Sequence, residues 1–315
     1  MKKIRLALIA GGKSDEREVS LKGAVGVAAA LDPEKYDVHR YDPATDLARL
    51  AADADKLDAA FILLHGLYGE DGTIQGFLEL LDIPYQGAGV LGSAAAMDKN
   101  LAKTMYRANG LPVAPWLMAE KRDIDTPERL IRELRLPCVV KPVRQGSSIG
   151  MSIVQQQDEL GPALALAFEH DIQVMVEEYI KGRELTAAVL GNEDLQALPL
   201  IEIIPDSRYA FFNYEAKYQP GATREVCPAE VEESIRIKAQ EYALVAHRCL
   251  GLRGYSRTDM MLSHDNQLYL LETNTIPGMT PTSLFPQAAA AAGYPFAALL
   301  DKLIELALEG KEQYK

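Results

Sequence analysis

Residues 1–93 alternate between short apolar segments and helix-like segments, and this alternation constrains the fold more than any other feature. Strand-like runs fall at residues 4–10, 36–41, 59–64 and 83–85, with helix-like segments between them at residues 20–31, 47–54 and 78–81. Alternating strands and helices are typical of a parallel sheet with helices packed on its faces. We therefore expect residues 1–93 to form an N-terminal parallel α/β domain.

The remainder of the chain divides into two smaller units. A helix over residues 93–109, capped by Ser93, leads into the first, and a long helix over residues 230–250 belongs to the second. Expected strands lie at residues 136–141, 150–154, 173–179, 183–190, 254–262 and 267–272, and a closing helix lies at residues 295–310. The first two of these strands form a hairpin with a Gly/Ser-rich connection. We place the two units at residues 94–182 and 183–315.

The composition excludes several classes of protein. A chain of 315 residues with 48% hydrophobic content can bury a substantial core. Its net charge of −12 argues against a nucleic-acid-binding protein, which usually carries a basic stripe. Cys138, Cys227 and Cys249 are widely separated and lack companion histidines at zinc-ligand spacing. Neither a disulfide framework nor a zinc site is therefore indicated.

The apolar segments are too short for a membrane protein. No segment reaches the roughly 20 apolar residues that a membrane helix needs. The apolar run at residues 6–10 leads directly into charged residues without a cleavage site, so we expect a buried strand rather than a signal peptide. We expect a cytoplasmic protein that contacts neither a membrane nor nucleic acid.

The loop that follows the first strand opens with Gly11 and Gly12 and runs into a helix. Glycines at such a junction commonly direct backbone N–H groups at a phosphate, because a helix N-terminus carries partial positive charge. Here Asp15, Glu16 and Glu18 lie in or near the first helical turn. Their charge would repel an anion, so a simple phosphate-binding interpretation fails.

Two acids and an amide gather on the expected C-terminal hairpin. If residues 265–266 form a two-residue turn, the register places Asp259 directly opposite Glu272. Asn274 then shares a face with Glu272, because side chains alternate along a strand. Opposed like charges destabilise a sheet, and three oxygen ligands favour a hard ion such as Mg²⁺. A solvated hairpin face with unrelated acids is the alternative.

Lys141 ends an apolar strand, where an unpaired ammonium would be costly to bury, so it needs an anionic partner. The loop after it contains Gly146, Ser147, Ser148 and Gly150, whose backbone N–H groups and hydroxyls could fold over phosphates. The loop is not a Walker loop, because it lacks the Gly-Lys-Ser/Thr ending. An ordinary mobile loop is the alternative.

Two other strand ends offer polar groups. The strand around Glu177 leads into a polar connection before Glu184, and such an exit can present backbone groups to an adenine and a carboxylate to a ribose. His65 follows the buried strand at residues 59–64. Loops at the carboxyl ends of parallel strands are where α/β sheets bind ligands. Each feature alone is most often structural.

Six motifs occur in order along the chain. They are Gly-Gly-x-Ser-x-Glu-Arg-Glu-Val-Ser from residue 11, His65-Gly66-x-x-Gly69-Glu70-Asp71-Gly72, Met97-Asp98-Lys99, Val140-Lys141-Pro142 with Gly146-Ser147-Ser148, Glu215-Ala216-Lys217-Tyr218, and Arg257-x-Asp259 with Glu272-x-Asn274-Thr275-x-Pro277-Gly278-Met279-Thr280. Together they resemble the ATP-grasp enzymes and, within them, the D-alanine:D-alanine ligases. The resemblance implies an α/β protein of ATP-grasp architecture, in which the N-terminal domain precedes two α+β subdomains that sandwich ATP.

The resemblance also implies a reaction. ATP would phosphorylate the carboxylate of one D-alanine, the amine of a second would attack the acyl phosphate, and the dipeptide would serve peptidoglycan synthesis. Asp259, Glu272 and Asn274 match the metal ligands of the family, which hold two Mg²⁺ or Mn²⁺ ions. The partners implied are D-alanine and ATP, and a homodimer is expected from the resemblance alone.

Other roles are carried over by the same match. The ATP-binding residues implied are Lys99, Lys141, Ser148, Glu177, Tyr179, Ile180, Glu184, Phe211 and Lys217. The substrate-binding residues implied are Glu16, His65, Arg257, Gly278, Ser283 and Leu284. The catalytic residues implied are Glu16, Ser147, Tyr218, Arg257 and Gly278. Glu16 would bind the amino group of the first D-alanine, which gives the acidic loop a cationic ligand instead of a phosphate.

The sequence departs from the family pattern at three positions. Thr258 and Thr273 stand where an aliphatic residue is usual, and Gln145 stands where Glu is common. Sibling ligases that use D-lactate or D-serine are the nearest alternative, although Tyr218 resembles the dipeptide-forming members. A nucleotide-binding ATP-grasp protein without catalysis is the second alternative, and the retained charged groups argue against it.

Overall fold

The alternating segments near the N-terminus form the parallel sheet that the sequence predicts. In the computed structural model, which describes residues 2–206 and 223–313, three strands pair in parallel in the order β2, β1, β3. The strands are β1 (Ile4–Ile9), β2 (Tyr36–Tyr41) and β3 (Ala59–Ile62), and the segments after them include α1 (Arg17–Ala30), α2 (Leu47–Ala52), the 3₁₀ turn η1 (Ala54–Lys56) and α3 (Thr73–Leu80).

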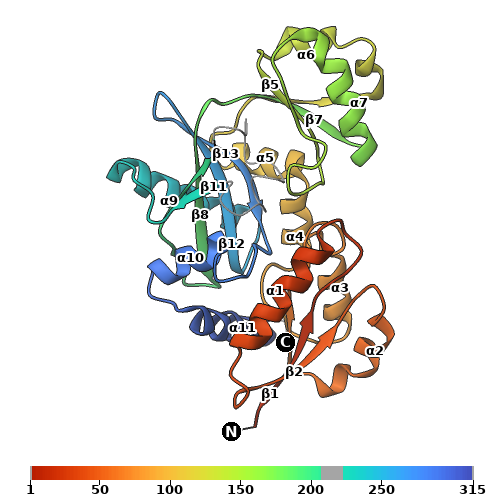
Figure 1. Cartoon of the computed structure of the whole chain (residues 1–315), viewed down its shortest axis with the longest axis vertical. Helices are drawn as coiled ribbons and strands as arrows, with labels where there is room; N and C mark the ends of the chain where they lie inside the picture. Colours follow the sequence, from red (N-terminus) through yellow and green to blue (C-terminus); the bar gives the residue numbers. More distant parts are fainter. Residues whose placement is uncertain (1, 207–222, 314–315) are drawn as a thin grey trace.

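The central strand β1 is apolar on both faces because helices cover both (Figure 1). Leu6 and Leu8 face a core that includes side chains of α1 and of the C-terminal helix α11 (Phe296–Gln313). Ala7 and Ile9 face a second core, which includes side chains of α2 and α3. A strand buried on both faces reads as a continuous apolar run, which explains the strength of the sequence signal.

Two of the expected elements differ in the structure. The strand predicted at residues 83–85 shrinks to one parallel bridge between Tyr85 and Ala60, because Pro84 has no N–H to donate to a ladder. The helix predicted over residues 93–109 is two helices, α4 (Val90–Met97) and α5 (Lys99–Ala108). Asp98 separates them with extended backbone, and its carboxylate accepts the N–H of Leu101 at 2.9 Å as an N-cap.

The second sheet has four antiparallel strands in the order β4, β7, β5, β6. It includes the expected hairpin, and helices pack on one face. Its elements are β4 (Trp116–Ala119), η2 (Lys121–Ile124), α6 (Glu128–Glu133), β5 (Cys138–Pro142), β6 (Ser152–Val154), η3 (Gln157–Glu159), α7 (Leu160–His170) and β7 (Val174–Glu178).

The third sheet has six strands, ordered β11, β10, β8, β12, β13, with β9 paired to β8. Helix α9 packs against β8, β9, β12 and β13. The elements are β8 (Gly182–Gly191), β9 (Gln196–Ala197), β10 (Ile201–Pro205), β11 (Thr223–Val226), α9 (Glu233–Cys249), β12 (Gly254–Ser263), β13 (Leu268–Asn274) and α10 (Leu284–Ala291). The strands of the second and third sheets therefore follow those of the first sheet along the sequence.

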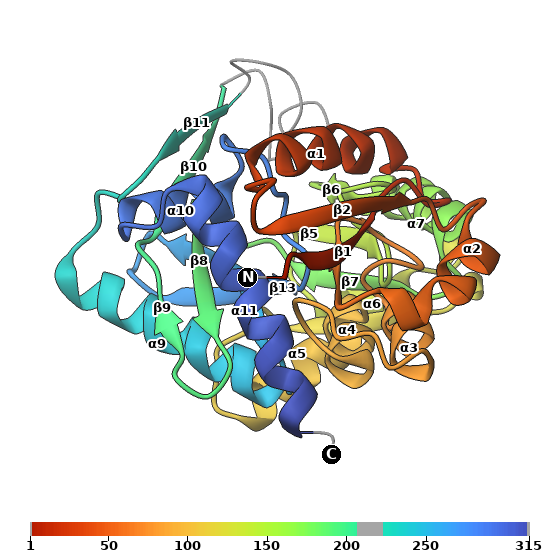
Figure 2. The ribbon, with the colours of Figure 1, turned by 90° about the horizontal axis from the view of Figure 1, so that it is seen from below.

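The C-terminal helix returns to the N-terminal part of the molecule. Figures 1 and 2 both place α11 beside the first sheet, and α11 contacts α1, β3, α10 and β12. Among the helices described here, none combines the length and the apolar character that crossing a bilayer requires.

Candidate functional site

A cavity of about 310 Å³ lies between the second and third sheets. Seven of the residues predicted to bind ATP line it, namely Lys99, Lys141, Ser148, Glu177, Tyr179, Ile180 and Glu184. Asp259, Glu272 and Ser147 line the same cavity. Three further predicted residues, Phe211, Lys217 and Tyr218, lie outside the residues that the structure describes.

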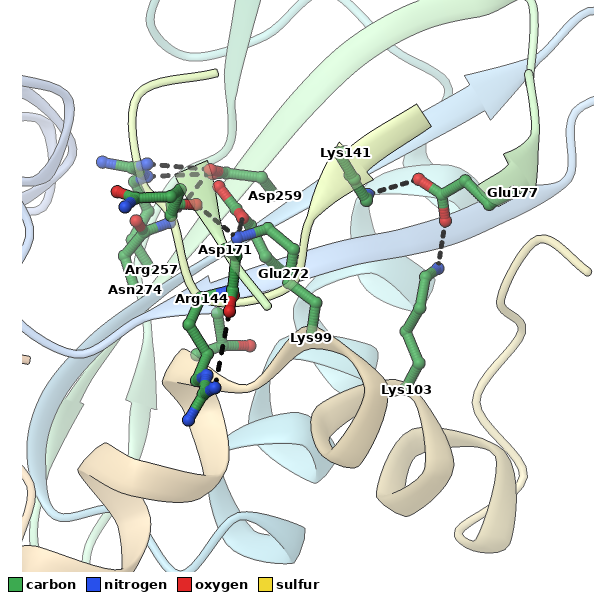
Figure 3. Close-up of polar contacts among 12 residues, drawn as sticks. Lys99, Lys103, Lys141, Arg144, Asp171, Glu177, Arg257, Asp259, Glu272 and Asn274 are labelled. Carbon is green, nitrogen blue, oxygen red and sulfur yellow. Dashed lines mark hydrogen bonds and ion pairs between the residues drawn. The ribbon is translucent and has the colours of Figure 1, made fainter. Parts of the chain in front are cut away.

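Two lysines share one buried glutamate, Glu177, which lines this cavity (Figure 3). Lys141 of β5 hydrogen-bonds to Oε1 of Glu177 on β7, and Lys103 of α5 lies 2.8 Å from its Oε2. Burial alone would raise the pKa of the Glu177 carboxyl, but the two ammonium groups outweigh burial and lower it to about 2. The anionic partner that Lys141 requires is therefore Glu177.

The hairpin places Asp259 opposite Glu272, as predicted, but by a different route. The connection is a three-residue loop, residues 264–266, in which Asn266 has a φ of 60° and Ser263 donates its N–H to Gln267 O at 2.9 Å. This loop shifts the register by one residue. A β-bulge at Leu271 shifts it back, so that Asp259 still pairs with Glu272.

The two carboxylates have cationic partners (Figure 3). Arg257 donates from Nε and Nη2 to Asp259 at 2.9 and 2.8 Å, while Asn274 Nδ2 lies 3.0 Å from Asp259 Oδ2. The ammonium of Lys99 lies 3.2 Å from Glu272 Oε2. Burial by itself would lower the pKa of Arg257, but the Asp259 charge outweighs burial and raises it. The guanidinium therefore stays charged inside the protein.

The oxygen donors fit a hard divalent cation. Asp259 and Glu272 are carboxylates on one face of neighbouring strands, and the side-chain amide of Asn274, whose Nδ2 donates to Asp259 Oδ2, carries a further oxygen donor. Thr186 of β8 donates its hydroxyl to Asp259 Oδ1 at 2.6 Å, which orients this carboxylate. No group of three or more His, Cys, Asp or Glu side chains that could hold a metal gathers anywhere in the described residues, so a metal here would use the amide or other oxygen ligands.

The acidic loop after β1 meets the Gly/Ser loop after β5. Of its three acids, only Glu16 is buried, and Oγ of Ser147 donates a hydrogen bond to its carboxylate. A Cβ on Gly146 would lie 3.1 Å from Glu16 Oε2, so the close approach of these loops favours glycine. The structure thus brings together residues 131 positions apart, and Lys99 Nζ fixes the same loop by donating to Gln145 O at 2.8 Å.

Arg17 holds the acidic loop in place. Its guanidinium donates to Gly12 O at 2.7 Å and to Asp42 at 2.5 Å, and Asp42 accepts the N–H of Gly12 at 2.9 Å. His65 and the glycines of this loop border a second cavity of about 540 Å³. Burial lowers the pKa of His65, so its imidazole is neutral at pH 7.

The sequence analysis assigns no role to Glu70, which it names only within the motif at residues 65–72. In the structure Glu70 links two loops of the site. Its carboxylate accepts the N–H of Gly66 at 2.8 Å and that of Ile276 at 3.2 Å, and so ties two loops together. Burial, reinforced by Glu16, raises the pKa of Glu70 to about 7. Lys103 and Thr186 were also missed. The spacing of four between Lys99 and Lys103 was the available signal, because it places both ammonium groups on one helix face.

The predicted second-substrate residues lie in the turn before α10. Ser283 is the residue before this helix, and its hydroxyl contacts Thr280 Oγ1 at 2.7 Å and accepts the Thr280 N–H at 3.2 Å. A side chain on Gly278 would meet the Ser283 hydroxyl. Leu284 is the first residue of α10 and is buried. The turn is therefore compact, with Gly278 close to the Ser283 side chain.

Proteins of known family match this chain over nearly its whole length. The family models described as D-ala D-ala ligase N-terminus and C-terminus match residues 39–88 and 105–305. A D-alanine–D-alanine ligase of Desulfotalea psychrophila is 61% identical, with 98% of this chain and 96% of the relative covered.

Two solved structures agree with these matches. The D-alanine–D-alanine ligase of Bacillus anthracis complexed with ATP has a TM-score of 0.85 and 35% identity, covering 99% of this chain and 100% of that one. A D-Ala:D-Ser ligase of Enterococcus faecalis has a TM-score of 0.83 and 32% identity, covering 97% and 100%. The architecture is therefore the predicted ATP-grasp fold, and the chain belongs to the D-alanine–D-alanine ligase family.

Proposed function

We propose that this protein joins two D-alanine molecules into D-alanyl-D-alanine at the expense of ATP, for peptidoglycan precursor synthesis. The carboxylate of the first D-alanine takes the terminal phosphoryl group of ATP and becomes an acyl phosphate. The amine of the second then attacks the acyl carbon, and inorganic phosphate leaves. The observation that carries the proposal is the grouping of Lys99, Lys141, Asp259 and Glu272 around one cavity.

The cavity has the groups that a nucleoside triphosphate needs. Lys99 and Lys141 supply positive charge for its phosphates, and Ser148 adds a hydroxyl nearby. We assign Glu177, Tyr179 and Ile180 to the adenine and Glu184 to the ribose, since all four line the cavity. Phe211 and Lys217 keep the ATP-binding roles implied by the family, as predictions on residues outside the described ranges.

We assign Asp259, Glu272 and Asn274 to two Mg²⁺ or Mn²⁺ ions. Their support is the opposed pair of carboxylates with an amide beside it. Such ions, when bound, neutralise the phosphate charge that develops during phosphoryl transfer. Lys99 and Arg257 hold the two carboxylates oriented before any ligand arrives.

The acidic loop supplies the binding site for the first substrate. Glu16 is buried beside Ser147, and its carboxylate can accept hydrogen bonds from an ammonium group. We assign Tyr218 to the same cluster and His65 to the substrate side of the loop. Closing the two loops over the acyl phosphate would exclude water, which otherwise hydrolyses it.

Charge on the reacting oxygen requires donors of its own. We assign this role to the guanidinium of Arg257 and the backbone N–H of Gly278. Ser283 and Leu284, in the compact turn after Gly278, are assigned to the carboxylate of the second D-alanine.

The second substrate could instead be D-serine or D-lactate, since the Enterococcus faecalis neighbour is a D-Ala:D-Ser ligase. The relatives of 61% and 59% identity are both D-alanine–D-alanine ligases and favour D-alanine. A protein without catalysis is disfavoured, because Arg257, Asp259 and Glu272 are all present and paired.

One assay tests the proposal. The pure protein is incubated with ATP, Mg²⁺ and D-alanine, D-serine, D-lactate or L-alanine, and products are identified by mass. We expect ADP, phosphate and D-alanyl-D-alanine with D-alanine. Absence of both ADP and dipeptide with D-alanine refutes the proposal, and a larger yield with D-serine or D-lactate would select a sibling activity.

We further propose that the protein is cytoplasmic, and we keep the division into units at residues 1–93, 94–182 and 183–315.

We also propose a homodimer. Leu80 of α3 and Leu91 of α4 are 87% and 78% exposed on helices that contact each other. Large exposed apolar side chains are typical of contact surfaces. Light scattering should give twice the mass of 34.6 kDa, and Leu80→Glu with Leu91→Glu should give the monomer. A monomeric parent would refute the dimer.

A further inference from the structure

A row of three buried hydroxyl groups, called here the hydroxyl chain, links helix α5 to strands β13 and β12 of the third sheet. The hydroxyl of Tyr106 on α5 donates to Thr273 Oγ1 at 2.6 Å, and Thr273 Oγ1 lies 2.9 Å from Oγ1 of Thr258. Tyr106 and Thr258 are fully buried and Thr273 is 4% exposed.

The bulge at Leu271 places the hydroxyl chain and the site on opposite faces of the same strands. Leu268 and Leu270, before the bulge, face the core that contains Tyr106. The extra residue shifts the alternation by one, so that Glu272 faces the cavity while Thr273 faces the core. The hydroxyl chain therefore sits directly behind the carboxylates, on the same two strands.

Packing alone does not require hydroxyls at these positions. The surrounding core is apolar, and an intramolecular hydrogen bond contributes only about 0.5–1.5 kcal/mol, so apolar replacements for both partners can be nearly neutral. A hydrogen bond is directional, whereas an aliphatic contact is not. The hydrogen bonds of Thr258 and Thr273 therefore fix the positions of β12, β13 and α5 relative to one another.

The hydroxyl chain ends at Tyr106, on the same helix as Lys99. Helix α5 begins at Lys99, and Tyr106 lies seven positions further along it. Lys99 pairs with Glu272 at 3.2 Å, and Tyr106 bonds to the residue after Glu272. The helix is thus attached to β13 at two points, one on the cavity face of the strand and one on its core face.

We propose that Tyr106, Thr273 and Thr258 are positioning residues that hold Lys99, Asp259 and Glu272 in the arrangement that binds the nucleotide phosphates with their divalent ion. This inference deepens the proposed function and rests on it. The three hydroxyls touch no substrate. They act by fixing the bulge and the start of α5.

The test is Thr258→Val with Thr273→Val, which keeps the shape and removes two hydroxyls. The readout is Mn²⁺ affinity in the presence of ADP, measured by electron paramagnetic resonance, together with kcat and KM for ATP. We expect Mn²⁺ to bind about 10-fold more weakly, as for other residues that orient metal ligands. The thermal midpoint should also fall, because the buried Tyr106 hydroxyl loses its acceptor on Thr273. Thr258→Ser with Thr273→Ser keeps the hydroxyls and should restore binding. Met260→Leu, on the same core face of β12, is the matched control and should bind Mn²⁺ normally.

Parental Mn²⁺ affinity in the double valine variant would overturn the inference. Equal loss in the valine and serine variants would also overturn it, because shape rather than hydroxyls would then be responsible. If the valine variant does not fold, Tyr106→Phe decides, since it removes a single hydroxyl, and normal Mn²⁺ binding there refutes the role. A parent that binds Mn²⁺ and ADP but makes no dipeptide would refute the proposed function and leave this inference to be judged by Mn²⁺ affinity.

Discussion

The ion cluster around Glu177 makes a quantitative prediction about stability. Glu177 → Gln leaves the ammonium groups of Lys103 and Lys141 buried without a carboxylate, and breaking a buried ion pair costs about 3–5 kcal/mol. The pKa gives a second estimate. A fall from an ordinary 4.5 to about 2, at roughly 1.4 kcal/mol per pKa unit, is about 3 kcal/mol. Lys103→Met should cost less, because Glu177 keeps Lys141 as a partner.

The sign of the pH dependence follows from the same shift. The folded protein holds Glu177 ionised to a lower pH than the unfolded chain does, so the stabilisation is present above pH 4.5 and is lost as the pH falls toward 2. Urea unfolding should show this loss in the parent and not in Glu177→Gln. Trp116, the only tryptophan in the sequence, pairs with Glu177 across β4 and β7, so its fluorescence reports on this region.

The matched control is Glu178→Gln on the same strand, which should change the free energy of unfolding little. The reasoning is refuted if Glu177→Gln is as stable as the parent. It is also refuted if Lys103→Met is the more destabilised of the two, because two ammonium groups sharing one carboxylate should tolerate the loss of one of them.

Three other predictions concern activity and acid stability. Asp259→Asn should lower kcat at least about 100-fold, as removal of one preorganised electrostatic group does, with a native circular dichroism spectrum; full activity would remove Asp259 from the site. Glu16→Gln should raise KM for D-alanine roughly 10- to 100-fold, from the loss of a charged hydrogen bond of about 1.5–3 kcal/mol, while KM for ATP stays constant; an equal rise in both would contradict an amine-binding role. Burial lowers the pKa of His247 to about 4. The free energy of unfolding should therefore be constant with respect to this group above pH 6.5, and it should fall by up to about 3 kcal/mol as the pH falls to 4. His247→Gln should flatten that part of the curve of unfolding free energy against pH, and an unchanged slope would contradict it.

The elements with strong periodic signals could be predicted from the sequence. Strand β1 is apolar on both faces and was predicted at residues 4–10, within one residue of Ile4–Ile9. The positions at which one helix ends and the next begins were harder to predict, because a single capping residue decides them. Asp98 ends one helix and caps the next, although the segment around it looks like one continuous helix.

The hairpin shows how a correct pairing can rest on a wrong turn. Asp259 and Glu272 pair as predicted, but through a three-residue loop and a compensating bulge at Leu271. A bulge depends on the packing of both faces of a sheet, which sequence alternation alone does not reveal. Lys103 was missed for a related reason, because its partner Glu177 is 74 positions away in the numbering of the chain.

The position of α11 has a consequence for the order in which the protein folds. Leu6 and Leu8 of the first strand share a core with Leu299 and Leu303 of the last helix. A chain leaves the ribosome N-terminus first, so this face of the first sheet is covered only in part, by α1, until α11 has been synthesised. Nascent chains halted before α11 should therefore keep part of this face accessible to chaperones and proteases, and emergence of α11 should close it.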